Sequence, residues 1–215
     1  MRIVALTNEG QLPMMKNMLN SAMKVGMNMK LFQCYIVSSD KEAAKYNTPE
    51  FIKLTTRKLE VILANMHDTT LWVDNDIVFF ENCLSDVLRY NGNFVMQDDL
   101  WGFCTGFLLA RPSIFGKILI QKCIQELVSN PKSGENDQHV FNKFCNRTPL
   151  ITLTKLPTDQ YPNGKVYFED NKKSSAKILH NNYLQTTAEK VQKFKDNNLW
   201  DESDTGFNLV SKYYI

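Results

Sequence analysis

Short apolar runs alternate along this chain with segments in which apolar side chains recur every three or four residues. The first run covers residues 2–6, a methionine-rich helical spacing follows at residues 13–25, and a second run covers residues 31–37. Short apolar runs are typical of buried strands, and the three- or four-residue spacing is typical of an amphipathic helix. Strand, helix and strand in this order predict a parallel α/β unit at the start of the fold.

The same two patterns predict the remaining elements. Helices are expected at about residues 56–66, 85–90, 112–128, 136–145 and 187–197. Strands are expected at residues 70–74, 93–97, 105–110, 150–155 and 177–182. The lysine-rich residues 165–177 are expected to form a mobile loop. Since no long linker or internal repeat interrupts these elements, the chain is predicted to form one domain.

Composition excludes several classes of protein. The chain has 215 residues and a formal net charge of +2, whereas a general nucleic-acid binder usually carries a strong basic excess. Its five cysteines are odd in number and no two have the C-x-x-C spacing, which argues against a zinc site or a disulfide framework. We find no signal peptide and no apolar run long enough to span a membrane. The composition therefore predicts reduced thiols and a cytoplasmic location.

Two carboxylates interrupt the most apolar part of the sequence. Asp74 and Asp76 lie within residues 69–80, which read TTLWVDNDIVFF. Asp74 ends a predicted buried strand, and in open α/β sheets ligands bind beyond the carboxyl ends of strands. Two oxygen ligands at this spacing suit Mg²⁺ or Mn²⁺ held together with a substrate phosphate. The alternative is an ordinary surface turn, for which Asp and Asn are common residues.

Further motifs give the chain a family resemblance. In order along the chain they read CTGFLLARPS at residues 104–113, NDQHVFN at 136–142, LPTDQYPNG at 156–164 and ILHNNY at 178–183, followed by Lys190 and NNLW at 197–200. Together with the Asp-x-Asp motif, they resemble the nucleotide-diphospho-sugar transferases of the GT-A fold. The size and style of the sequence also resemble virus-encoded glycosyltransferases of the chlorovirus kind.

The resemblance implies a fold and a metal site. The fold is a Rossmann-like α/β/α sandwich around a central mixed, mostly parallel sheet, with a nucleotide-binding part at about residues 1–80 and a sugar- and acceptor-binding part at 81–215. Asp74, Asp76 and His180 would hold Mn²⁺ (or Mg²⁺). The alternative for His180, which follows an apolar strand, is a histidine that only packs in the core.

The resemblance also implies where the donor, a UDP-sugar, binds. Thr7 and Asn8 follow the first strand and would contact uracil and ribose, with Asn75 nearby. Either Arg57 or Lys58 would contact the donor, and the sequence does not separate them. The other implied donor contacts are Thr105, Gly106 and Lys190. The glycine that usually precedes the lysine in this family is absent here, where the chain reads QTTAEK.

Four residues are candidates for roles near the reacting sugar. By resemblance, Asp137 and Gln138 face the anomeric carbon and the acceptor. Asp98 and Asp99 follow a predicted strand and could accept hydrogen bonds from sugar hydroxyls. An inverting transferase needs a carboxylate base, for which Asp98, Asp99 or Asp137 would serve. The resemblance favours a retaining reaction.

The sequence as a whole therefore predicts a metal-dependent transferase that moves a sugar from a UDP-sugar to a glycan or glycoprotein acceptor. One alternative is a haloacid-dehalogenase-type phosphatase, because Asp74 and Asp76 also fit its D-x-D motif. The other is a non-catalytic module that only binds nucleotide sugars. Further domains of a longer chain are also considered as partners.

Overall fold

The computed structural model describes residues 1–38, 45–131, 134–148, 150–170 and 175–215. Within these residues the central sheet has the strand order β7 (Leu153–Leu156), β5 (Phe94–Asp98), β6 (Phe103–Ala110), β3 (Thr70–Val73), β1 (Arg2–Asn8), β2 (Phe32–Val37) and β9 (Ser211–Tyr214). Strand β6 is antiparallel to β3 and β5, and the other neighbours are parallel. This confirms the predicted mixed, mostly parallel sheet.

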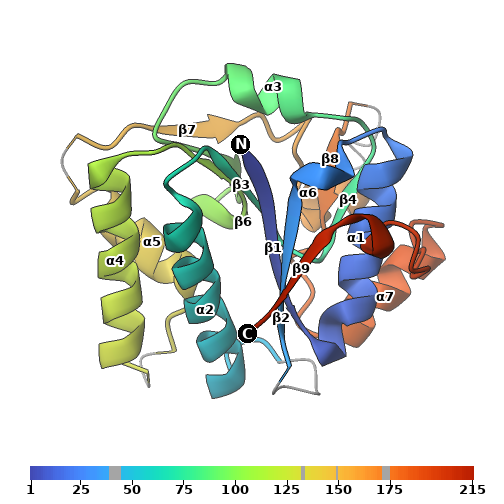
Figure 1. The fold of residues 1–215 in the computed structure, drawn as a ribbon, viewed down its shortest axis with the longest axis horizontal. Coiled ribbons are helices and arrows are strands. Elements are labelled where there is room, and N and C mark those ends of the chain that lie inside the picture. The colour runs from blue at the N-terminus through green and yellow to red at the C-terminus, as the bar shows by residue number, and fades with distance from the viewer. Residues whose placement is uncertain (39–44, 132–133, 149, 171–174) are drawn as a thin grey trace.

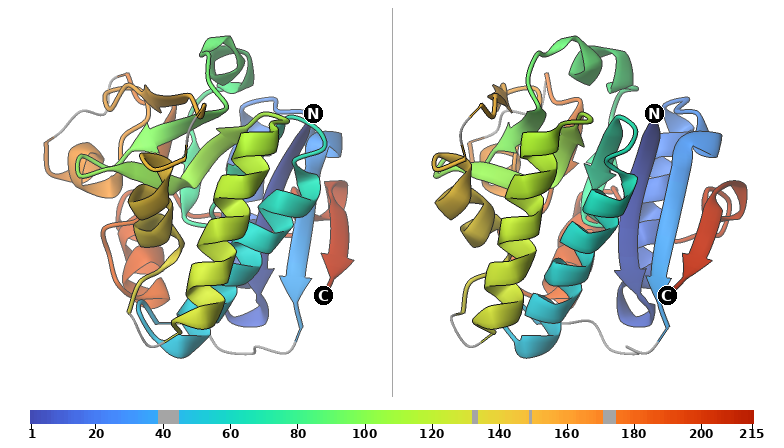
Figure 2. Two further views of the ribbon diagram at one scale, coloured as in Figure 1. Left: turned by 90° about the vertical axis from the view of Figure 1, so that its left-hand side faces the viewer. Right: turned by 60° about the vertical axis from the view of Figure 1, so that its left-hand side comes forward.

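Helices cover both faces of this sheet (Figures 1 and 2). Helices α2 (Pro49–Asn65), α4 (Ile114–Ser129) and α5 (Asp137–Cys145) lie on one face. Helix α1 (Leu12–Lys24) packs on the other, beside α7 (Thr187–Asp196) and a two-stranded sheet of β4 (Ile77–Phe79) and β8 (Ile178–His180). Side chains alternate across β1, so that Ile3 packs in the core under α1 and Val4 packs in the core under α2 and α4. The result is the predicted α/β/α sandwich.

Most predicted elements are present, and the differences have local causes. The parallel pairing of β1 with β2 confirms the strand–helix–strand start. Helix α2 begins at Pro49, well before the predicted residue 56, because the Thr48 hydroxyl accepts a hydrogen bond from the Phe51 amide and Pro49 suits the first helical turn. Strand β7 likewise occupies residues 153–156 instead of 150–155, and β8 covers only 178–180.

Helix α6 and strand β9 are among the elements that were not predicted. Helix α6 (Gly164–Phe168) extends into the region expected to be a mobile loop, and its first turn is capped by Asn163, whose side chain accepts from the Val166 amide. The loop prediction was therefore wrong for these residues, and residues 171–174 lie outside the described part of the chain. Strand β9 is short and largely exposed, and it exists through its pairing with β2. The short helix α3 (Leu84–Arg89), in contrast, agrees with the helix predicted at residues 85–90.

The cysteines belong to the core. All five are buried and none is in a disulfide. Burial raises the pKa of Cys34, Cys83 and Cys123 to about 12, which keeps these thiols protonated and unreactive at neutral pH. Among the described helices, none combines the length and apolar character needed to cross a bilayer.

Candidate functional site

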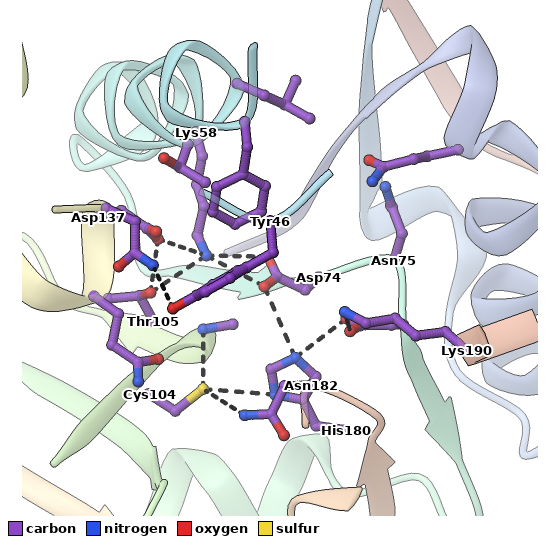
Figure 3. A pocket seen from close by; sticks show the side chains of 18 of the residues that line it. Tyr46, Lys58, Asp74, Asn75, Cys104, Thr105, Asp137, His180, Asn182 and Lys190 are labelled. Carbon is purple, nitrogen blue, oxygen red and sulfur yellow. Dashed lines mark hydrogen bonds and ion pairs between the residues drawn. The ribbon is translucent and has the colours of Figure 1, made fainter. Parts of the chain in front are cut away.

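A pocket of about 380 Å³ opens beyond the carboxyl end of β3 (Figure 3). Its lining includes residues from α2, from the turn after β3, from β6, from the start of α5 and from the region between β8 and α7. Asp74 immediately follows β3, and its backbone amide donates to the carbonyl of Gly106 at 2.8 Å. The position agrees with the rule that ligands of α/β sheets bind beyond the carboxyl ends of strands.

Asp74, Asp76 and His180 come together at one side of this pocket. Each offers a ligand atom, and these atoms lie within 4.8 Å of one another. The Nε2 atom of His180 is 3.1 Å from an Asp76 oxygen and 3.8 Å from an Asp74 oxygen. The antiparallel pairing of β4 with β8 creates this arrangement, because it places Ile77, the residue after Asp76, opposite His180. Two carboxylates and an imidazole form a donor set that suits Mn²⁺.

The amino group of Lys190, on α7, adds a positive charge to this cluster. Its Nζ atom lies 2.6 Å from the second carboxylate oxygen of Asp76. Burial acts to raise the pKa of Asp76, but Lys190 and His180 outweigh burial and hold this pKa well below its usual range. In turn, burial disfavours a charged His180, yet the Asp76 carboxylate raises the His180 pKa well above its usual value. An incoming cation therefore competes with Lys190 for Asp76.

Gly106 on β6 leaves the space in which these side chains meet. A Cβ atom at this position would overlap the imidazole of His180 and lie 2.6 Å from an Asp74 oxygen. Any side chain larger than hydrogen therefore displaces two members of the triad.

We expect Gly106→Ala to abolish Mn²⁺ binding, because its methyl group pushes Asp74 and His180 apart. Titration calorimetry with Mn²⁺ measures the loss, and circular dichroism checks that the sheet and helices remain. Wild-type Mn²⁺ affinity in this variant would contradict the proposed ligand geometry.

Lys58 on α2 holds a second group of charges together (Figure 3). Its Nζ atom is 2.9 Å from Asp137 and 3.1 Å from Asp74. The Thr105 hydroxyl donates to the same Asp137 oxygen at 2.7 Å. Burial opposes the charged form of Lys58, but Asp137 and Asp74 outweigh burial and raise the Lys58 pKa. This lysine therefore remains an ammonium ion inside the protein.

The structure separates Lys58 from its neighbour Arg57. Lys58 lines the pocket, whereas Arg57 pairs with Glu60 at 2.7 Å on the outer face of α2 and its side chain is 53% exposed. Of the two residues that the sequence left as alternatives, the geometry thus favours Lys58 for any contact with a ligand in the pocket.

The far side of the pocket is built around Asp99. One of its oxygens accepts from Gln138 at 2.8 Å, and the other accepts from Asn163 at 3.1 Å and Asn182 at 2.9 Å. Asp98 instead pairs with Lys155 at 2.8 Å and is outside the pocket lining. The structure therefore brings Asp99, Asp137 and Gln138 to the pocket and leaves Asp98 aside.

Three further candidates lie near the end of β1. Thr7 and Asn8 are buried and outside the pocket lining, and the Asn8 side chain accepts from the Gln11 amide. Asn75 lines the pocket, and its Nδ2 atom donates to the Leu6 carbonyl at 2.9 Å. Its Oδ1 atom is buried and has no hydrogen-bond partner among the described residues. A buried acceptor of this kind is the exception in proteins and indicates a place for a donor group of a ligand.

Sequence reasoning missed residues that contact the triad, among them Trp72 and Gln97. The Trp72 indole donates to Asp74 at 2.6 Å, and the Gln97 side chain lies 2.7 Å from the second ring nitrogen of His180. Gln97 carried a usable signal, since it is a polar residue that follows the apolar residues 94–96 of β5, much as Asp74 follows the apolar end of β3.

Comparison with known proteins agrees with this geometry. Residues 16–194 match the model of the nucleotide-diphospho-sugar transferase family. A UDP-D-xylose:L-fucose α-1,3-D-xylosyltransferase of Arabidopsis thaliana is 34% identical over 106 residues, which cover 45% of this chain and 29% of the relative. The chain spans half or less of the length of the curated relatives that it matches.

Solved structures that share the fold include two glycosyltransferases. The glycosyltransferase GlyE of Streptococcus pneumoniae superposes with a TM-score of 0.62 at 14% identity, over 96% of this chain and 63% of that one. A glycosyltransferase involved in glycosylation of the major capsid of PBCV-1 also gives 0.62, at 15% identity, over 91% of this chain and 100% of that one. The likeness to such enzymes confirms the predicted GT-A fold.

Proposed function

Because this chain belongs to the nucleotide-diphospho-sugar transferase family, we propose that it is a metal-dependent glycosyltransferase that uses a UDP-sugar. The acceptor is a hydroxyl group of a glycan or glycoprotein. The observation that carries the proposal is the meeting of Asp74, Asp76 and His180 at the wall of a pocket that also contains two lysines. This arrangement provides both a cation site and positive charge for a diphosphate.

The triad would hold Mn²⁺ or Mg²⁺. Two observations support the fit: the donor set of two carboxylates and an imidazole, and the space left beside it by Gly106. A cation held there would supply charge neutralisation for the diphosphate and so would make the nucleotide a better leaving group. Lys190 lies close to this site through its ion pair with Asp76. It could leave Asp76 and bind a phosphate of the donor instead, because an ammonium binds phosphate as a point charge.

Other pocket residues would position the donor. The Asn75 Oδ1 atom is the acceptor that we assign to a ribose hydroxyl, since Asn75 lines the pocket and this buried atom lacks a hydrogen-bond partner in the described chain. Thr105 and Gly106 border the sugar, and Asp99 with Gln138 forms the opposite side. We assign the nucleotide to the part of the pocket built from residues 1–80 and the sugar and acceptor to the part built from residues 81–215.

We further propose a retaining reaction. Outside the triad, the carboxylates among the pocket-lining residues are Asp99 and Asp137. Both Asp99 oxygens accept hydrogen bonds from side-chain amides, and Asp137 is bound by Lys58 and Thr105. A catalytic base needs a lone pair directed at the acceptor hydroxyl. These contacts favour a front-face route in which the leaving phosphate takes the proton, and an inverted anomeric configuration of the product by NMR would contradict it.

Titration calorimetry against UDP-, GDP- and CMP-sugars, with and without Mn²⁺, tests the donor class. We expect binding of a UDP-sugar that requires Mn²⁺. The folded chain binding no nucleotide sugar would contradict the proposal, and binding without hydrolysis or transfer would indicate a non-catalytic module. Because a transferase forms no phosphoryl-enzyme on Asp74, detection of one would indicate the phosphatase alternative.

A further inference from the structure

We propose that Gln97 is a positioning residue that fixes the tautomer and the orientation of His180. Gln97 is fully buried on β5, next to the point where its pairing with β6 shifts register between Met96 and Gln97. Such an irregularity re-aims a side chain, and here it coincides with a buried polar side chain that follows three apolar residues. The role of His180 as a metal ligand rests on the proposed function, whereas its tautomer does not.

The direction of the Gln97 amide follows from a backbone carbonyl. The Nε2 atom of Gln97 lies 3.0 Å from the carbonyl oxygen of Tyr161. A carbonyl oxygen only accepts, so the amide nitrogen must face Tyr161 and the amide oxygen must face the other way. That oxygen lies 2.7 Å from the Nδ1 atom of His180. Tyr161 is itself fully buried, with its hydroxyl bound to Asp86 at 2.7 Å and its ring stacked on Phe107.

The proton on His180 follows from the amide. An amide oxygen also only accepts, so the Nδ1 atom of His180 must carry hydrogen. When a cation replaces the second proton of the ring, the other nitrogen, Nε2, supplies the lone pair, and Nε2 is the atom that faces Asp74 and Asp76. The other neighbour of Nδ1 is the Cys104 sulfur at 3.5 Å, which is a weak acceptor. Gln97 thus presents the lone pair of His180 to the cation site.

Two substitutions separate this role from simple packing. Gln97→Met keeps the length of the side chain and removes both hydrogen bonds. In its carboxylate form, Gln97→Glu restores an acceptor for the Nδ1 hydrogen but, like Met, has no hydrogen to donate to the Tyr161 carbonyl. The difference between the two variants therefore reports the bond to His180, and the bond to Tyr161 cancels.

The first readout needs no metal. In ¹H–¹⁵N spectra of the metal-free protein we expect a slowly exchanging Nδ1–H signal that is absent from His180→Asn, because this ring is only 2% exposed. The signal should vanish in Gln97→Met, persist in Gln97→Glu, and persist in Cys104→Ala. If the wild-type protein lacks it, or if it survives in Gln97→Met, the inference is overturned whatever the fate of the metal proposal.

The second readout is the metal. Substitution of a residue that hydrogen-bonds to a metal ligand typically lowers metal affinity by about 10–100-fold. We expect Gln97→Met to weaken Mn²⁺ binding in that range. The electron paramagnetic resonance spectrum of Mn²⁺ bound to Gln97→Met should lose the coupling to an imidazole nitrogen. Gln97→Glu should recover both the Mn²⁺ affinity and this coupling. Equal losses in the two variants would reduce Gln97 to a support for Tyr161 and overturn the inference. A wild-type chain with the Nδ1–H signal but no Mn²⁺ binding would refute the proposed function alone.

Discussion

Replacing Asp76 with Asn is expected to abolish Mn²⁺-dependent binding of a UDP-sugar while the chain remains folded. Asn has nearly the same shape as Asp but lacks the charge that a cation needs, and Asp76 is the triad member with contacts to both His180 and Lys190. Substitution of a residue that only hydrogen-bonds to a metal ligand lowers metal affinity by about 10–100-fold. Loss of a ligand itself should therefore lower it by at least about 100-fold. Titration calorimetry with Mn²⁺ and the UDP-sugar measures this loss.

A matched control for this variant is Asp204→Asn. Asp204 also pairs with a lysine, Lys16, at 2.7 Å, but its side chain is 61% exposed and outside the pocket lining. The Asp204→Asn substitution removes the same charge as Asp76→Asn and should leave the affinities for metal and donor unchanged. Full metal-dependent binding by Asp76→Asn, with thermal unfolding close to that of the wild-type chain, would remove Asp76 from the metal site.

The sequence revealed two of the three triad residues through local physics and the third only through resemblance. Asp74 and Asp76 interrupt an apolar run, which is costly unless a charged ligand compensates. His180 shows no comparable signal, because an apolar strand that ends in histidine also fits a core position. What brings His180 to Asp76 is the pairing of β4 with β8, and that pairing joins segments about a hundred residues apart. No local pattern contains such a contact.

The choice between Arg57 and Lys58, by contrast, could be made from the sequence, because the helical repeat shows which of the two shares a face with buried residues. Lys58 stands three residues after Thr55 and four before Ile62, and both are buried, so it shares their face of α2. Arg57 shares a face with Glu60 and is exposed. The predicted start at residue 56 left out Thr55, one of the two buried residues on this face, because the Thr48 cap and Pro49 lie outside the strongly apolar part of the helix.

Strand β9 shows a different limit of sequence reasoning. Its residues are mostly exposed and lack the alternation of a half-buried strand. It forms by pairing with the edge of β2, where the ring of Tyr213 stacks on that of Tyr35 at a centroid distance of 5.0 Å. An element that depends on a partner already in place becomes visible only in the folded chain.

The largest effect on stability is expected from Lys58→Met. Lys58 is buried between Asp74 and Asp137, and methionine keeps the length of its stem against Trp72 while removing the charge. Two carboxylates then face each other without a cation, and breaking a buried ion pair in this way costs about 3–5 kcal/mol of unfolding free energy. Urea denaturation without metal measures it. Because the pKa of Lys58 is raised in the fold, its contribution is complete below about pH 10.4, the pKa of an unperturbed lysine, and falls only in more alkaline solution.

The adjacent residue provides the matched control. Arg57→Met removes the same charge one position earlier on α2, where the pair with Glu60 is exposed and contributes less than about 1 kcal/mol. Adding Asp137→Asn to Lys58→Met should restore part of the loss, since one uncompensated carboxylate disappears while the Thr105 hydroxyl keeps an acceptor. If Lys58→Met and Arg57→Met unfolded at the same urea concentration, burial of the Lys58 charge would have no energetic consequence. The ion pairs that Lys58 forms with Asp74 and Asp137 would then not contribute to the stability of the fold.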